Sequence, residues 1–272
     1  MRLAAGIVIA LAVAASQAGT GLIAAGVVAA LLASGGTLLP GEPGSPGRPL
    51  ETVSTISQLS SAAVFATAFG AYAVPEYPRF AAAGLLVVAV ALAGFGVRLA
   101  EPVKRAVTGV LALGGVLLLA VSFGIEPVSA TAAPGATVPG FLLAVAALYP
   151  VFVTGPGRWR YLATAVFGLA IIAGAVYQLG AARLGLSLTS MKDLLTAADA
   201  ERFLTALLLF VALATITATI DTAAEVPAGR ETAVCVVLVL AVLVFGGPVG
   251  TLVLATLAGL ARTALRYRAH RG

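Results

Sequence analysis

The sequence predicts an all-α integral membrane protein with nine or ten transmembrane helices. It is 60% hydrophobic and only 10% charged, with a mean hydropathy of +1.07, whereas about a quarter of the residues in a soluble domain are charged. Eight stretches of eighteen or more residues contain no Asp, Glu, Lys or Arg, and about 20 apolar residues cross a bilayer core. These stretches are residues 3–41, 52–75, 80–97, 106–125, 127–157, 161–182, 203–220 and 232–261.

Two of these stretches are long enough to hold two spans each. Gly246, Gly247 and Pro248 interrupt residues 232–261 and predict a tight turn between two helices, with a re-entrant hairpin as the alternative. Residues 3–41 are broken near Gly19, which predicts a short segment at 3–17 and a full span at 20–36. The short segment is also compatible with a cleaved signal peptide ending near residue 18.

The spans are predicted to be helices because a lipid-exposed backbone must satisfy its hydrogen bonds internally. A β-barrel would alternate lipid-facing and lumen-facing residues, and this sequence lacks that alternation. Ala, Leu, Val and Gly dominate the spans, and the whole chain contains 31 glycines. Such small residues let helix backbones approach closely inside a bilayer. We therefore expect residues 1–272 to form a single polytopic helical domain.

Basic residues predict the orientation in the cell membrane. One assignment of the loops places eleven Lys and Arg residues on one side and four on the other, and the richer side is expected to be cytoplasmic. The multi-pass chain then ends in a basic cytoplasmic tail at 262–272. The eleven are Arg48, Arg98, Lys104, Arg105, Arg158, Arg160, Arg230, Arg262, Arg266, Arg268 and Arg271, and the four are Arg79, Arg183, Lys192 and Arg202.

The loop at 183–202 has a helical pattern of its own. Leu188, Met191 and Leu195 recur at helical spacing, opposed by Lys192 and Asp193. This pattern is typical of a short amphipathic helix on a membrane surface, although a plain loop with some helical character would also fit.

The sequence shows no signature of catalysis, metal binding or nucleic-acid binding. It has no His cluster, no Gly-x-Ser-x-Gly elbow and no P-loop, and its single Cys and single His make no ligand set. No catalytic residue, metal site or cofactor is therefore expected. The net charge of +5 is explained by attraction to anionic lipid headgroups, so the bilayer is the expected partner and no nucleic acid is needed.

Two features could serve a substrate or only the fold. Ser57 and Gln58 belong to a polar run that starts one span. Their side chains would either bond to helix backbone or line a polar cavity. Pro150 follows Tyr149 within a span and is expected to break or kink that helix, which frees backbone carbonyls. Discontinuous helices of this kind mark the substrate site in many secondary transporters.

The order of segments resembles the bacterial amino-acid permeases of the amino acid-polyamine-organocation superfamily. The resemblance starts at Phe69-Gly-Ala-Tyr-Ala-Val-Pro75-Glu-Tyr-Pro78-Arg79 and continues through Lys104-Arg105, in the manner of that family's third to fifth helices. It resumes over 188–200, 203–223 and Val226-Pro227-Ala-Gly-Arg230-Glu231. The resemblance implies an incomplete five-plus-five inverted-repeat fold and transport of amino acids or related small amines. It places the substrate site at Gly6, Ile7, Tyr149 and Pro150, with Ser57 and Gln58 as polar additions.

The chain departs from the family pattern at both halves of that site. Only Gly6-Ile7 stands where the family has a Gly-x-Gly-type stretch, and Leu148-Tyr149-Pro150 lacks the glycine of the family's unwound sixth helix. The alternative to a transporter is therefore a non-transporting membrane subunit or scaffold. A transporter predicts a polar cavity and an unwound helix between the first and sixth segments, whereas a scaffold predicts packed small residues there.

Overall fold

The computed structural model describes residues 2–38, 48–124, 135–153, 157–197, 201–227 and 230–269. The predicted loop centred on residues 39–47 and the last three residues of the basic tail lie outside this part of the chain. All elements of the described residues are helices, and none is a strand. The first half comprises α1 (Arg2–Ala18), α2 (Leu22–Leu38), α3 (Arg48–Ala73), α4 (Pro78–Gly94) and α5 (Glu101–Gly124). The second half comprises α6 (Val138–Phe152), α7 (Arg158–Leu184), α8 (Ser190–Ala197), α9 (Leu204–Ala223), α10 (Arg230–Ala241) and α11 (Gly247–Ala269).

Four helical stretches are long and apolar enough to cross a membrane: residues 2–35, 158–184, 204–223 and 231–269. The predicted class of helical membrane protein is thereby confirmed. Two of these stretches each contain two helices, so the four stretches comprise six helices. Helices α4 and α6 are apolar but have only 17 and 15 residues, fewer than the roughly 20 that span a bilayer core without tilt or thinning.

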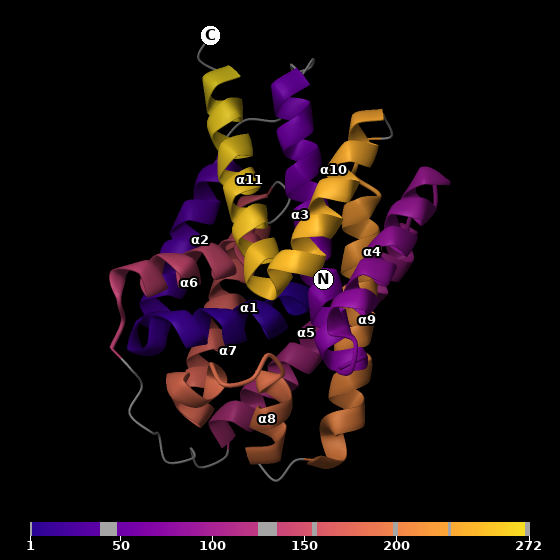
Figure 1. The fold of residues 1–272 in the computed structure, drawn as a ribbon. Coiled ribbons are helices and arrows are strands. Elements are labelled where there is room, and N and C mark those ends of the chain that lie inside the picture. Colours follow the sequence, from indigo (N-terminus) through magenta and orange to yellow (C-terminus); the bar gives the residue numbers. More distant parts are fainter. Residues whose placement is uncertain are drawn as a thin grey trace.

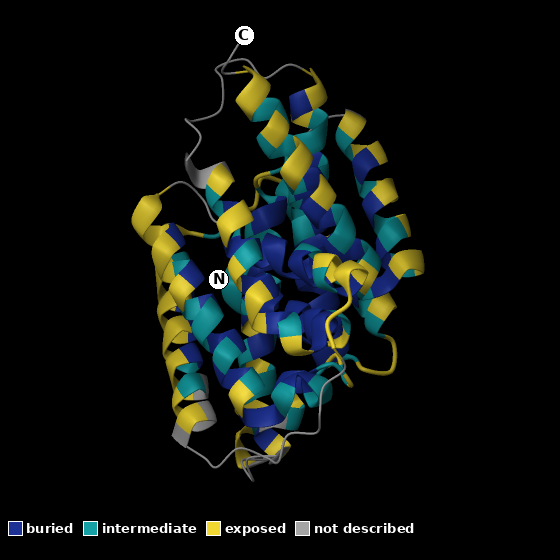
Figure 2. Cartoon of the chain, turned by 90° about the vertical axis from the view of Figure 1, so that its left-hand side faces the viewer, coloured by how far each residue is buried: buried dark blue, intermediate teal, exposed yellow. Residues whose placement is uncertain are grey.

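Helix α1 forms the core of the bundle. Every residue from Ala5 to Ala15 is buried, and α1 contacts α3, α6, α7 and α9. Figure 1 shows α1 and α6 lying across the molecule, whereas α3, α9 and α11 run along its length. A helix that is apolar on all faces belongs in an interior. Loss of this segment as a signal peptide would therefore empty the middle of the bundle, where the buried residues of Figure 2 gather.

The helices form two packed sets. In the first set, α6 packs on α1 and α2, and α7 packs on the same two helices. In the second set, α3 packs on α4, α9, α10 and α11. The sets meet where α1 touches α3 and α9, and where α6 touches α11.

The predicted break at Gly246, Gly247 and Pro248 is confirmed. Helix α10 passes through a π-helical turn (Val242–Gly246), and Gly247 has a φ of 61°, a conformation that is open to glycine at little cost. The chain then reverses into α11 (Figure 1). Arg79 donates a hydrogen bond of 3.2 Å to the Val244 carbonyl, so the first turn of α4 satisfies a backbone group at this bend.

Candidate functional site

The residues predicted to bind a substrate are distributed over α1, α3 and α6. Gly6 lies where α1 crosses α6, because a Cβ built on it would be 3.1 Å from the Val151 side chain and 3.3 Å from the Phe65 ring. Gly6, Ile7, Tyr149, Pro150 and Val151 are all buried. Ala5, Ala10, Ala14, Ala144 and Ala147 are buried on the same two helices. Gly6 itself is enclosed by the larger Val151 and Phe65 side chains, and α1 is helical throughout.

Pro150 leaves one backbone carbonyl of α6 without its helical donor, and a side chain of another helix donates to that carbonyl instead. Proline has no backbone donor for the carbonyl four residues earlier, which is that of Ala146. The Thr256 hydroxyl of α11 donates to this Ala146 oxygen. Helix α6 ends at Phe152, so the proline lies in its last turn. The Ala146 carbonyl, which a substrate would need as a hydrogen-bond acceptor, is thus already hydrogen-bonded within the protein.

Tyr149, Ser57 and Gln58 do not join Gly6 in one pocket. The Tyr149 ring packs against α11, where a Cβ built on Gly259 would be 2.9 Å from it. Ser57 and Gln58 lie about two helical turns before Phe65 on α3. The Ser57 carbonyl accepts the Ser61 hydroxyl at 2.8 Å. The Gln58 Oε1 atom is buried and has no hydrogen-bond partner among the described residues.

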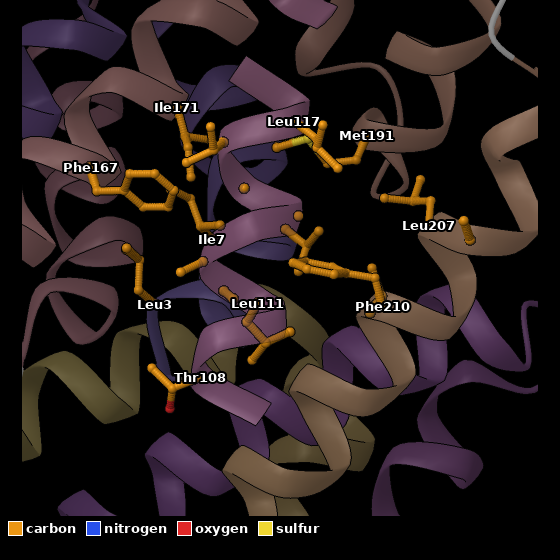
Figure 3. A pocket seen from close by; sticks show the side chains of 18 of the residues that line it. Leu3, Ile7, Thr108, Leu111, Leu117, Phe167, Ile171, Met191, Leu207 and Phe210 are labelled. Carbon is orange, nitrogen blue, oxygen red and sulfur yellow. The ribbon is translucent and has the colours of Figure 1, made fainter. Parts of the chain in front are cut away.

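A cavity of about 590 Å³ opens away from this crossing, between α1, α5, α7, α8 and α9 (Figure 3). Of the predicted site residues, only Ile7 lines it. Its wall is almost entirely apolar, with Phe167 of α7 and Phe210 of α9 facing the glycine pair Gly114-Gly115 of α5. The sequence interpretation missed this cavity, although that glycine pair marks where the two rings approach α5.

The two hydroxyl groups in the cavity wall each donate a hydrogen bond to their own helix. The Thr108 hydroxyl donates to the Lys104 carbonyl at 2.7 Å, and the Thr164 hydroxyl donates to the Arg160 carbonyl at 2.8 Å. Each carbonyl belongs to the preceding turn of the same helix. The wall therefore offers no charged group and no free donor for the carboxylate and ammonium of an amino acid.

Two ion pairs tie helices together at one end of this cavity. Arg2 Nη2 is 2.5 Å from Glu225 Oε1, and Lys104 Nζ is 2.7 Å from Asp221 Oδ1. Lys104 is also 3.4 Å from Glu101. The Asp221 side chain is only 17% exposed. The pairs therefore connect α1 and α5 to the C-terminal end of α9.

The Lys104–Asp221 pair is expected to stabilise the fold measurably. The hydrogen bond that the Lys104 ammonium donates to the Asp221 carboxylate raises the pKa of Lys104. Because this pKa is raised, the contribution of the ion pair to the free energy of unfolding is complete below about pH 10.4. It is lost as the pH rises through the pKa of Lys104 in the folded protein. We expect Lys104→Met to lower the free energy of unfolding by about 1 kcal/mol, measured as a lower thermal midpoint in detergent. The exposed Lys192 of α8 supplies the control Lys192→Met. Equal midpoints for the two variants would contradict the prediction.

The fold and these sites define a helical membrane protein. In the described chain no group of three or more His, Cys, Asp or Glu residues could hold a metal ion. Comparison with protein-family models, with curated proteins and with solved structures finds no match. The residues of the structure therefore carry every functional argument that follows.

Proposed function

We propose that the chain is a permease-like protein of the cell membrane with nine or ten spans and a cytoplasmic C-terminus. Contacts between the loops support this topology. Lys104 and Arg230 were assigned to the same side from the sequence, and Lys104 pairs with Asp221 at the end of α9, the helix that leads to Arg230. Arg79 was assigned to the opposite side, and it contacts the turn between α10 and α11, which the same topology places there.

Within that architecture, the function that the geometry supports best is a non-transporting membrane subunit or scaffold. The observation that carries this proposal is the filled crossing of α1 and α6. The Val151 and Phe65 side chains enclose Gly6, buried alanines line both helices, and the Thr256 hydroxyl donates to the carbonyl that Pro150 frees. A zwitterion needs exposed backbone or helix ends at this place.

Transport of amino acids or related amines is the second candidate. It is favoured by the division into two helix sets, because alternating access commonly involves one bundle rocking against another. The Arg2–Glu225 pair joins α1 to the end of α9 and would have to break if α1 moved away from α9. In this reading the structure represents one closed arrangement.

Uptake into liposomes separates the two functions. The purified protein is reconstituted and tested with labelled amino acids and polyamines, with and without a proton gradient. The scaffold proposal expects no uptake above empty vesicles. Saturable uptake that Gly6→Val abolishes and Gly84→Val preserves would contradict it, because Gly6 lies in the crossing whereas a Cβ on Gly84 meets no atom within 4 Å.

A further inference from the structure

The lining residues of the cavity between α1, α5, α7, α8 and α9 follow α5 and α7 from one end of the cavity to the other. Along α5 its lining runs from Thr108 through Leu111 to Leu117, and along α7 it runs from Thr164 through Phe167 to Ile171. Figure 3 shows Thr108, Leu111 and Leu117 in this order along α5, and Phe167 and Ile171 in the same direction along α7, with Met191 of α8 at the far end from Thr108. The N-terminal ends of α5 and α7 therefore lie at the same end of the cavity.

Two arginines extend the cavity wall at that end. Arg105 precedes Thr108, Ala112 and Gly115 at spacings of three, seven and ten residues, which place all four on one helix face. Arg160 precedes Thr164, Phe167 and Ile171 at spacings of four, seven and eleven residues. Each arginine therefore lies on the same helix face as these lining residues, about one turn before the first of them.

These arginines carry the surplus positive charge of this end. Arg2 and Lys104 are paired with Glu225 and Asp221, and Lys104 also with Glu101. Arg105 and Arg160 are exposed, and neither has an acidic partner within ion-pair distance among the described residues. Two exposed arginines without an acidic partner therefore lie about one helical turn before the cavity lining on α5 and α7.

An apolar cavity with positive charge at one end suits a ligand that has a hydrocarbon chain and an anionic group better than it suits a zwitterionic amino acid. The wall has no free polar group deep inside, because both threonine hydroxyls bond to their own helices. Its volume of about 590 Å³ lies in the range of roughly 300–1,000 Å³ that is typical of ligand sites. Arginine binds phosphate oxygens with two parallel hydrogen bonds, and an anionic membrane lipid carries both a phosphate and a hydrocarbon chain.

We propose that this cavity binds one anionic phospholipid, with an acyl chain along α5 and α7 and the phosphate at Arg105 and Arg160. Helix α8 closes the chain end, because Met191 and Leu195 are buried there and line the cavity. The site is independent of whether the bundle transports a solute.

Binding is tested by native mass spectrometry of the full chain, titrated in detergent with phosphatidylglycerol or with phosphatidylcholine of the same chains. We expect one phosphatidylglycerol to bind, with an apparent Kd at least about tenfold below that for phosphatidylcholine. Arg105→Gln with Arg160→Gln removes this preference. The control Arg98→Gln with Arg268→Gln removes the same charge away from the cavity stripes and retains the preference.

The chain-binding part is tested by filling the cavity. Ala112→Phe places a ring in the wall and is expected to weaken the binding of both lipids by about tenfold or more. Leu113→Phe, on the exposed neighbouring position of α5, leaves binding unchanged. An unchanged size-exclusion profile and thermal midpoint show that each variant is folded.

Three outcomes would overturn the proposal. They are equal affinity of the wild type for the two lipids, equal behaviour of the two arginine pairs, and full binding by Ala112→Phe. Displacement of the lipid by a free amino acid would instead assign the cavity to a solute. Uptake in liposomes, which would overturn the scaffold function, leaves these lipid affinities as a separate result.

Discussion

Gly70→Leu is expected to prevent α3 and α4 from packing. A Cβ at residue 70 would overlap the Pro78 carbonyl and lie 2.9 Å from the Pro78 carbonyl carbon. These are backbone atoms that cannot rotate away. Only Val74 to Tyr77 connect the two helices, so relief requires moving the start of α4. Overpacking of this kind costs about 3 kcal/mol or more, a large part of the roughly 5–15 kcal/mol that stabilises a protein.

The measurement is the yield of monodisperse protein and its thermal midpoint in detergent. Gly84→Leu is the matched control, because Gly84 lies on α4 and a Cβ there meets no atom within 4 Å. We expect the control to behave as the wild type. Similar losses in both variants would show that the Gly70 contact is not decisive for the fold.

Phe152→Ala is expected to destabilise the other helix set. The Phe152 ring is fully buried and fits against Gly168 of α7, where a Cβ would be 2.7 Å from the ring. The Leu3 side chain of α1 lies 3.1 Å from the same Cβ position at Gly168. Removing the ring leaves a void where three helices meet, and the surrounding atoms lose their dispersion contacts. Phe→Ala changes at such buried sites cost about 3–5 kcal/mol.

Phe80→Ala supplies the control, because the Phe80 side chain is 70% exposed on α4. Thermal unfolding of both variants in the same detergent compares the two effects. We expect a clearly lower midpoint for Phe152→Ala and a change of about 0.5 kcal/mol or less for Phe80→Ala. A reversed order would mean that α6 and α7 are not held together by this contact.

The predicted substrate site shows where sequence reasoning reaches its limit. Gly6 and Val151 do meet, as expected if α1 crosses α6. However, Tyr149 packs on α11, and Thr256 bonds to the carbonyl that Pro150 frees. Thr256 lies 110 residues from Ala146, so no local pattern could connect them.

The cavity was missed for a related reason. Its lining residues are the Leu, Ala, Gly, Val and Phe that form every other span. In a soluble helix an apolar stripe identifies the buried face, but in a bilayer lipid-facing and protein-facing positions are both apolar. Arg2 and Glu225 illustrate the same limit, because they pair across 223 positions of sequence.

The sequence by itself determined the helical membrane class and the break at Gly246 to Pro248. The reason is local: apolar stretches in lipid must satisfy their own backbone groups, and glycine with proline ends a helix wherever it occurs. Only the tertiary structure decided that α1 is the core, that the α1–α6 crossing is filled and that the open cavity lies beside α5. Those outcomes depend on which side chains meet between helices, and a nearly uniform apolar sequence does not specify its own partners.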